Sequence, residues 1–569
     1  MMVHCNTMSD ATQKGWKLRD FPPFGFAQEL GFTPFHAHLL YNRGVQTAED
    51  AELFLNTDER LLNDPKMLPD MPKAVERLRQ ALDGGEHIAI FGDFDADGIT
   101  GTALLTTALR SLGAKVTPLL PNRADEGHGL NTRAINLMAE GGASLLITVD
   151  CGTTSVDEVD QAAELGIDTI ITDHHTVLPQ VPASHALINP RHPDSLYPFG
   201  GLTGVGMSFK LIEALYGALD EDWPEHLLEF VALGTVADVG PLQGENRFLV
   251  KRGLESLNRT DNPGIQALAG SARMNMGTLD TESLSFGIIP RLNVPGRLSD
   301  PKVALHLLTT DSADVARSLA DEIEHLNGKR QELTHRAVAE AEAQVERQCE
   351  LPYILIVKSA DWIPGILGLI AGRLSEQYYR PAIAISIDGE ICRASARSIP
   401  EFSIIKAMGE SAELFDEWGG HPRAAGFTMQ IANLPALEQN LYCTAAEWLD
   451  GQSLAPSIDI DCEVRLEAFT PNNVNFILSL GPFGEGNPSP VFLTRGVRVV
   501  EARRVGSGGR HLKMRLNQGR TTIDAIAFNL GHLAGVTRRE IDVVYSVGLD
   551  SWQGRTTLQM TVQDLCASN

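Results

Sequence analysis

The sequence has few cysteines and no long apolar run. Its seven cysteines are scattered, odd in number and without a CxxC pair, so neither a disulfide scaffold nor a structural zinc knot is expected. No stretch of about 18 apolar residues is present, which argues against a membrane span. The N-terminal segment lacks the apolar centre of a signal peptide, so we expect a cytoplasmic location. A Walker-type motor is disfavoured, because no GxxxxGK[ST] motif occurs.

Basic residues are also in deficit. The 569 residues include 47 Lys and Arg against 73 Asp and Glu, a formal net charge of −26. Such a chain is not a general binder of polyanions, so any nucleic-acid binding must use local basic pockets or metal ions. One region runs against the trend, because residues 491–540 hold ten Lys and Arg against three acids. The 43% of hydrophobic residues exclude wholesale disorder.

Short apolar runs alternate with helical patterns between residues 87 and 173. This alternation is typical of βαβ units and predicts a parallel sheet with helices on both faces. The strands are expected at 87–93, 115–122, 144–150 and 168–173, and the helices at 99–112, 131–139 and 154–165.

The second half of the chain has a different pattern. A highly charged stretch within residues 311–348 predicts a long helix, which either lies on the surface or connects two lobes. A second α/β unit begins with the apolar run 353–357 and extends to about residue 450. From Ser457 onward the chain is rich in short β runs, which indicates a small barrel or sandwich, and we favour an OB-like barrel.

We therefore expect an α/β protein in which a parallel-sheet domain is linked by a long helix to a second α/β domain, followed by an OB-like barrel. The expected regions are an N-terminal region, 1–80; a catalytic domain, 81–240; a helical extension with the connecting helix, 241–350; the second α/β domain, 351–452; and the barrel, 453–569.

Polar side chains follow four consecutive predicted strands. Ligands in open α/β sheets bind beyond the carboxyl ends of the strands, so these side chains are expected at one edge of the sheet. They are Asp93, Asp95 and Asp97 after the first strand, Arg123 after the second, Asp150 after the third, and Asp173, His174 and His175 after the fourth.

This cluster predicts a metal site. Several carboxylates packed together cannot all remain ionised without a cation. Oxygen ligands with one or two imidazoles suit Mg²⁺ or Mn²⁺, and two such ions could activate water and stabilise charge on a phosphate. The DxDxDG run at 93–98 alone is also consistent with a turn or an EF-hand fragment, but the glutamate expected at the end of an EF-hand loop is missing.

Several motifs resemble those of the DHH phosphoesterase superfamily. They are GDFDADGITGTALL (92–105), TVDCGTTS (148–155), TDHHT (172–176) and GTVADVGPL (234–242), while GGHPRAAGF (419–427) is similar to the companion DHHA1 domain. Within the superfamily, PNRADEGHGLN (121–131), RLNVPGR (291–297), SARS (395–398) and GPFGEGNPSPVF (481–492) resemble the RecJ family of bacterial single-strand-specific exonucleases. The resemblance covers about residues 80–540.

The resemblance implies two divalent cations, Mn²⁺ or Mg²⁺, and a role for each site residue. Asp150 would bridge the ions, His175 would face the substrate phosphate, and Asp173 would fix a histidine tautomer. The implied catalytic residues are Asp97, Asp150, His174 and His175, and the implied metal ligands are Asp93, Asp95, Asp97, Asp150, His174 and Asp238.

Further residues would bind phosphates or guide the strand. Guanidinium forks suit phosphate oxygens. The phosphate-binding candidates are Arg123, Arg291, Arg297, Ser395, Arg397 and His421, and the barrel candidates are Arg503, Arg504, Arg510, Lys513 and Arg515. The barrel cations alone are equally consistent with a solvated face. The chain departs from the family pattern at His128, where tyrosine is frequent, and at Ile363, where histidine is common.

The implied function is metal-dependent hydrolysis of single-stranded DNA from the 5′ end to mononucleotides, in DNA repair and recombination. The implied partners are single-stranded DNA with a 5′ end, single-strand-binding protein and a helicase, for a chain that acts as a monomer. The alternatives are a DHH-type phosphodiesterase for short oligonucleotides or small nucleotides, and an inactive DNA-binding relative. The inactive relative is disfavoured because Asp95, Asp97, Asp150, His174 and Asp238 are all present.

Overall fold

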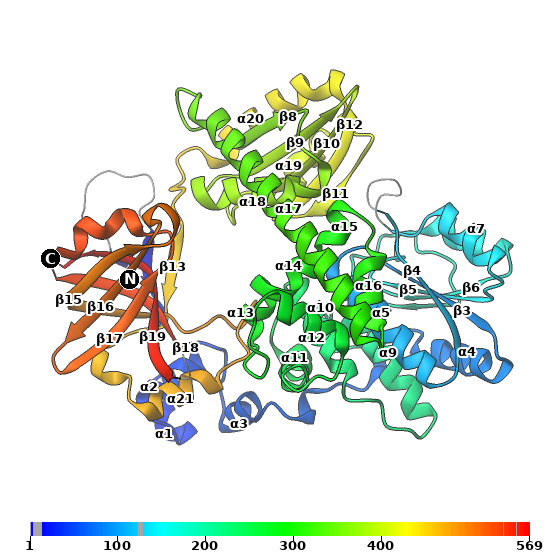
Figure 1. The fold of residues 1–569 in the computed structure, drawn as a ribbon, viewed down its shortest axis with the longest axis horizontal. Helices are drawn as coiled ribbons and strands as arrows, with labels where there is room; N and C mark the ends of the chain where they lie inside the picture. The colour runs from blue at the N-terminus through cyan, green and yellow to red at the C-terminus, as the bar shows by residue number, and fades with distance from the viewer. Residues whose placement is uncertain (1, 4–13, 123–128, 539, 553–554, 569) are drawn as a thin grey trace. The chain divides into compact units, whose positions relative to one another are not determined.

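The computed structural model describes residues 2–3, 14–122, 129–538, 540–552 and 555–568. The chain forms two compact units (Figure 1). One is Leu61–Leu454, and the other combines Met1–Arg60 with Ala455–Asn569.

The larger unit begins with the expected parallel sheet. Its five strands lie in the order β4-β3-β5-β6-β7, and every pairing is parallel. Because β3, β5, β6 and β7 are largely buried on both faces, they read as near-continuous apolar runs, whereas the edge strand β4 is partly exposed. Their bounds are β3 His87–Gly92, β4 Lys115–Leu119, β5 Leu145–Val149, β6 Asp168–Thr172 and β7 Ala186–Ile188.

Helices cover both faces of this sheet, as predicted. Alternate strand residues such as Ile88 and Ile147 pack with α4 (Met71–Gly84), α5 (Ala96–Ser111) and α9 (Gly204–Ala218) in one core. The intervening residues, including Ala89 and Leu146, pack with α7 (Thr132–Glu140) and α8 (Val156–Glu164) in another. The period of two places successive side chains on opposite faces.

A helical layer extends the first core. It contains α10 (Leu227–Ala237), α11 (Gly244–Leu257), α12 (Pro263–Ser271), α13 (Thr281–Ser283), a π-helical turn labelled η3 (Leu284–Ile288), α14 (Ile289–Leu292), α15 (Val294–Leu298) and α16 (Lys302–Thr309).

The long charged helix is α17 (Ala313–Glu346). Its first half contributes Ala316, Ala320 and Ile323 to the core of the parallel-sheet lobe. Its second half contributes Ala337 and Ala341 to the core of the second lobe. The sequence left open whether this helix lies on the surface or connects two lobes. Because α17 packs in both cores, the connecting helix is confirmed.

The second lobe is built on a mixed sheet of five strands in the order β11-β12-β10-β9-β8. Only β8 and β9 run parallel. The strands are β8 Leu355–Ser359, β9 Ala382–Asp388, β10 Ile391–Arg397, β11 Glu417–His421 and β12 Ala424–Gln430; the helices are α18 Leu367–Tyr378, α19 Ile404–Gly409 and α20 Leu434–Leu449.

The other unit contains a closed barrel. Strands β15 (Phe492–Val505), β16 (His511–Gln518), β17 (Thr521–Ala527), β19 (Arg555–Ala567) and β18 (Ile541–Trp552) pair in that order. The barrel closes because β18 pairs back with β15. Closure removes exposed strand edges, and it confirms the expected OB-like barrel. Around it lie β13 (Ser457–Ile460), β14 (Cys462–Glu463) and α21 (Pro471–Ser479).

The N-terminal residues belong to this barrel unit. Strand β2 (Gly15–Leu18) pairs with β1 (Met2–Val3) and, in parallel, with β13, and the indole N–H of Trp16 donates to Asp564 Oδ2 at 2.8 Å. Helices α1 (Phe26–Leu30), α2 (Pro34–Tyr41) and α3 (Ala48–Asn56) pack in the same core as the barrel strands. The two ends of the chain thus build one folded unit. Among the described helices, none combines the length and the apolar character needed to cross a membrane.

Candidate metal centre and nucleic-acid contacts

Two of the aspartates that follow β3, Asp95 and Asp97, are held by helix N-termini. Asp95 caps α5, and its Oδ1 accepts hydrogen bonds from the N–H groups of Asp97 and Gly98 at 3.0 and 3.2 Å. The carboxylate of Asp97 accepts from Gly204 N–H at 2.6 Å and from Val205 N–H at 2.9 Å, at the start of α9. Unpaired N–H groups at helix starts favour negative charge, so both side chains are fixed in place.

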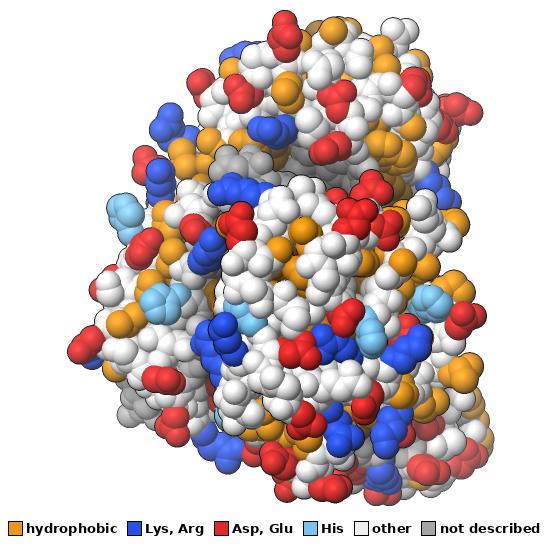
Figure 2. All heavy atoms as spheres, turned by 90° about the vertical axis from the view of Figure 1, so that its right-hand side faces the viewer, with side chains coloured by type: hydrophobic (Ala, Val, Ile, Leu, Met, Phe, Trp, Pro, Cys, Tyr) orange, Lys and Arg blue, Asp and Glu red, His pale blue; other side chains and the backbone are white. Residues whose placement is uncertain are grey.

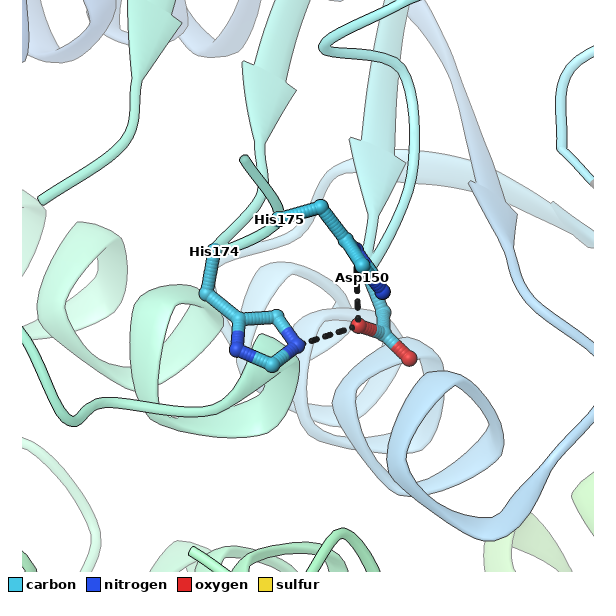
Figure 3. A group of neighbouring side chains, drawn as sticks. All are labelled: Asp150, His174 and His175. Carbon is cyan, nitrogen blue, oxygen red and sulfur yellow. Dashed lines mark ion pairs between the residues drawn. The ribbon is translucent and has the colours of Figure 1, made fainter. Parts of the chain in front are cut away.

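Asp150 and His174 face each other at the end of β5 and β6 (Figure 3). Their Oδ1 and Nε2 atoms are 3.0 Å apart, and neither atom has a hydrogen-bond partner among the described residues although both are buried. Two adjacent ligands on one octahedral ion, with bonds of about 2.1 Å, lie about 3 Å apart. The pair therefore fits two ligands of a single divalent cation.

A glycine makes room for this arrangement. Asp150 adopts a left-handed backbone with φ 60°, which brings its side chain against the first turn of α9. A Cβ on Gly204 would lie 2.4 Å from the Asp150 Cβ. Only glycine therefore fits at position 204 with Asp150 in its present place.

The six predicted metal ligands form overlapping groups. Within each group, one ligand atom per residue lies within 4.8 Å of the others. The groups are Asp93, Asp95 and Asp150; Asp97, His174 and Asp238; and Asp150, His174 and His175. Because Asp150 and His174 are each shared between groups, the donor set suits two neighbouring cations.

The carboxylates of this cluster repel one another. Burial, followed by the charge of Asp97, raises the pKa of Asp150 well above its usual value, and burial with the charge of Asp238 does the same for Asp97. Burial and the charge of Asp95 raise the pKa of Asp238 to about 6. Divalent cations would relieve this repulsion and restore the ionised forms.

The two histidines have opposite electrostatic environments. Burial lowers the pKa of His174 to about 3, which leaves its ring neutral and suited to bind a metal. The hydrogen bond between His175 Nδ1 and Asp173 Oδ1, 2.8 Å long, raises the pKa of His175 to about 9. Asp173 therefore forms its ring hydrogen bond with His175 and not with His174. This bond orients the His175 ring and stabilises its protonated form.

Asp173 holds the loop as well as the ring. Burial alone would raise its pKa, but the hydrogen bonds of His175 and Thr153 keep that pKa well below the usual value. Its Oδ1 also accepts from the N–H groups of His174 and His175 at 2.7 and 3.1 Å. The carboxylate therefore fixes the backbone that carries both histidines.

Two phosphate-binding candidates lie at the start of α18. Arg397 Nη1 donates to Ser395 Oγ at 3.3 Å. A Cβ on Gly368 would lie 3.0 Å from Arg397 Nη2 and 3.2 Å from Ser395 Oγ. Because Gly368 has no side chain, the hydroxyl of Ser395 and the guanidinium of Arg397 lie directly against the first turn of α18.

The remaining candidates occupy different surroundings. The ring of His421 lies 6.5 Å from that of His175, nearly parallel at 14°, so it belongs beside the metal cluster. Arg291 is bound to Glu324 through Nε at 2.5 Å, and Arg297 Nη1 donates to Gly365 O at 3.1 Å, tying α15 to the second lobe. Arg123 and His128 lie outside the described residues.

The barrel candidates differ in their charge partners. Arg503 stands directly opposite Lys513 on adjacent strands. Arg515 lies 3.4 Å from Asp524, so its charge is partly balanced. Arg504 pairs in register with Leu512, and Arg510 lies just before β16. Figure 2 faces the side of the parallel-sheet domain on which α4 and α7 lie in Figure 1, and acidic and basic side chains are interspersed there, without a broad basic field.

Two residues near the metal cluster, Asn189 and Arg191, were not predicted from the sequence. The buried Asn189 amide donates to His175 O at 2.9 Å and to Thr153 Oγ1 at 3.1 Å, and accepts from Arg191 N–H at 2.8 Å. The positive charge of Arg191 acts on His174, Asp238 and His421. Both residues follow β7 at the carboxyl edge of the sheet, and this position is the signal that could have identified them.

Family comparisons agree with this arrangement. The DHH family, N-terminal domain, matches residues 87–235, the DHHA1 domain matches 352–444, and the RecJ OB domain matches 460–564. The single-stranded-DNA-specific exonuclease RecJ of Bacillus subtilis is 37% identical over 95% of this chain and 69% of its own length. RecJ of Escherichia coli K12 is 34% identical, over 94% of this chain and 96% of its own length.

Solved structures show the same likeness. The crystal structure of RecJ from Thermus thermophilus in complex with Mn²⁺ has a TM-score of 0.84 at 30% identity, covering 97% of this chain and 80% of that chain. A second structure of that protein, in complex with Mg²⁺, has a TM-score of 0.77 at 29% identity, covering 97% and 78%. The protein is thus a member of the RecJ family, with DHH, DHHA1 and RecJ OB domains.

Proposed function

We propose that this protein is a hydrolase that degrades single-stranded DNA from the 5′ end to mononucleotides, with two divalent cations, Mn²⁺ or Mg²⁺, as cofactors. The observation that carries the proposal is the cluster of Asp93, Asp95, Asp97, Asp150, His174 and Asp238 at one sheet edge. The names of its RecJ relatives supply the substrate class.

The cations would polarise a phosphodiester and make a water molecule acidic enough to attack it. The protein's own residues keep the ligands in place and supply counter-charge to the phosphate. Asp97 is held by two backbone N–H groups. The hydrogen bond to Asp173 raises the pKa of His175 to about 9, which favours the protonated ring, and this ring would donate to a phosphate oxygen. His421, 6.5 Å away, closes the phosphate site from the second lobe.

The 5′ phosphate would bind at Ser395 and Arg397. Both lie against the first turn of α18 at Gly368, where N–H groups and the helix dipole favour a dianionic group. Arg297 would join them from the first lobe, and the family resemblance makes Arg123, which lies outside the described residues, a further phosphate-binding candidate. Arg291 would act through its bond to Glu324, by holding α14 against the long helix. Such a pocket selects one chain end and sets the direction of degradation.

The barrel would hold the strand that leads to the site, through Arg503, Arg504, Arg510, Lys513 and Arg515. A phosphodiesterase for short oligonucleotides or small nucleotides needs no such domain, so we place that alternative second. From the family resemblance we further propose a cytoplasmic monomer that acts in DNA repair and recombination with single-strand-binding protein and a helicase.

Mn²⁺-dependent release of nucleotides tests the proposal. The substrates are a 5′-phosphorylated single strand, the same strand in a duplex, and a dinucleotide. We expect wild-type protein to release mononucleotides from the 5′ end of the single strand, and Asp97→Ala and His174→Ala to lose at least about 10³-fold in rate, the usual scale for a lost catalytic group. Asp321→Asn, an exposed aspartate on α17, serves as the control.

Three outcomes contradict the proposal. Undiminished activity in both variants would place the active site elsewhere. Release from the 3′ end first would reverse the direction. A preference for the dinucleotide over the long strand would favour the alternative enzyme.

A further inference from the structure

The metal ligands that follow β3 touch a segment that lies far away in the sequence. We call Asp93–Asp97 the metal loop and Asn293–Arg297 the bridging segment. The N-cap side chain of α5 accepts from the second and third N–H groups of that helix, so the first N–H, that of Ala96, needs an acceptor from elsewhere. Asn293 Oδ1 accepts this hydrogen bond at 2.9 Å. The donor residue lies between two of the proposed metal ligands, so the bond fixes the backbone that carries both.

The bridging segment also packs against the metal loop through its backbone. Gly296 is buried, and a Cβ at this position would lie 2.5 Å from Phe94 O. Only glycine allows so close an approach without a shift of one of the two backbones. The contact joins main chain to main chain, so no rotatable side chain lies between the two segments to absorb a movement.

The other end of the bridging segment is fixed by the second lobe. A Cβ on Gly365 would lie 2.2 Å from Arg297 O, and Arg297 Nη1 donates to Gly365 O at 3.1 Å. Gly365 belongs to a 3₁₀ turn, η4 (Pro364–Ile366), which leads directly into α18. Its neighbour Ile366 is buried in the core of the second lobe. The position of Gly365 is therefore set by that core.

We propose that Asn293 is a positioning residue for the metal ligands, and that the bridging segment makes the Mn²⁺ affinity of the cluster depend on contacts in the second lobe. Helix α17 joins the lobes through side chains in both cores, whereas the bridging segment makes close backbone contacts at both ends. A closely packed interior transmits a shift, and the outer partners of metal ligands tune affinity. The inference rests on the metal site of the proposed function and adds control of ligand placement from the second lobe.

The Mn²⁺ affinity of the full-length protein without DNA tests the role of Asn293. Calorimetry gives the affinity, and urea unfolding in EDTA gives the stability. Asn293→Ala leaves the Ala96 N–H without its acceptor and should weaken Mn²⁺ binding about 10- to 100-fold, the range for a lost outer partner of a metal ligand. The matched control is Asn258→Ala. The Asn258 side chain also accepts from a backbone N–H, that of Leu279 at 2.6 Å, so its loss should lower the stability comparably and leave the Mn²⁺ affinity unchanged.

Two substitutions at the far end test the second lobe. Gly365→Ala places a Cβ against Arg297 O and should weaken Mn²⁺ binding about 2- to 30-fold, the usual range for coupling through packed contacts. Its control is Gly264→Ala, whose Cβ would lie 1.9 Å from Leu307 O in the same unit and which should leave the affinity unchanged. Arg297→Met keeps the test available if Gly365→Ala does not fold. It removes the hydrogen bond to Gly365 O and a positive charge; because loss of the charge alone would strengthen Mn²⁺ binding, weaker binding isolates the positioning effect.

Each part of the inference has its own contrary result. Wild-type Mn²⁺ affinity in Asn293→Ala would overturn the role of Asn293, and unchanged or tighter binding in Arg297→Met would overturn the dependence on the second lobe. An equal loss of affinity in the control variants would show a general effect of instability and overturn both. Mn²⁺ binding by the wild-type protein with no change in any variant would overturn this inference alone, whereas no Mn²⁺ binding by the wild-type protein would overturn the proposed function as well.

Discussion

Replacing Asp238 by asparagine should stabilise the metal-free protein while it weakens metal binding. Asp238 Oδ2 lies 3.7 Å from His174 Nε2, and burial with the charge of Asp95 raises its pKa from 3.8 to about 6. That rise corresponds to about 3 kcal/mol against the ionised form. Because the side chain is 38% exposed, solvent screening reduces the figure to about 1 kcal/mol.

The sign depends on pH in a defined way. A carboxyl group whose pKa is higher in the folded state binds more protons folded than unfolded, so its destabilising effect is complete above about pH 6 and is lost as pH falls towards 3.8. In EDTA, Asp238→Asn should therefore raise the free energy of unfolding by about 1 kcal/mol at pH 8 and by about half as much at pH 5. Urea unfolding at the two pH values measures both.

In Mn²⁺ the order of stability should reverse, so that wild type is more stable than Asp238→Asn. At a free Mn²⁺ concentration 100 times its Kd, a bound ion stabilises the folded state by about 2.7 kcal/mol, and the variant loses part of this because one ligand is gone. Asp321→Asn, on the exposed side of α17, should unfold like wild type throughout. If Asp238→Asn lowered the stability of the metal-free protein at pH 8, the repulsion argument would be refuted.

Three further substitutions test single contacts. Arg191→Gln removes a positive charge near His174 and Asp238, so Mn²⁺ affinity measured by calorimetry should stay equal or increase. The rate of DNA hydrolysis should nevertheless fall about tenfold. Slower hydrolysis that weaker metal binding explains would contradict this prediction. Arg77→Met breaks ion pairs to Glu86 and Asp168 at 2.7 and 2.6 Å. Because both carboxylates remain partly exposed to solvent, the free energy of unfolding in urea should fall by only about 1–3 kcal/mol. An unchanged urea midpoint would show that the ion pairs contribute nothing to stability. Trp16→Phe removes the indole donor to Asp564, whose pKa is raised by burial. When unfolding of the barrel unit is followed, the substitution should cost about 1–2 kcal/mol, and more at pH 8 than at pH 5. Equal costs would show that the protonation state of Asp564 does not change between the two pH values.

The parallel sheet could be predicted because its information is local. Strands β3, β5 and β6 begin and end within one residue of the predicted runs, apart from the polar residues that follow them. The same regularity located most of the site, since consecutive parallel strands must end at one edge. Asp238 was different, because it caps the C-terminus of α10 and only the family resemblance connected it with the other ligands.

Contacts between distant segments could not be predicted. The pairing of β2 with β13 joins Trp16 to Ile458, and no local pattern identifies partners so far apart in sequence. The bond from Arg291 to Glu324 is of the same kind, because it depends on where α17 passes α14. Asn189 looked like an ordinary turn residue, and its three hydrogen bonds appear only once β5, β6 and β7 stand side by side.

The net charge of −26 constrains how a polyanion is held. The field of an acidic protein opposes the approach of DNA, and salt screens that field within about 8–10 Å. Binding must therefore come from short-range contacts, and the proposed ones are the metal cluster and a few cations such as Arg503 and Lys513, which face each other on β15 and β16. Phosphate contacts weaken as salt rises, because each contact releases counterions from the DNA. As ionic strength increases, the affinity for single-stranded DNA should therefore fall, with a slope of log affinity against log salt of about −0.7 for each phosphate that the protein contacts.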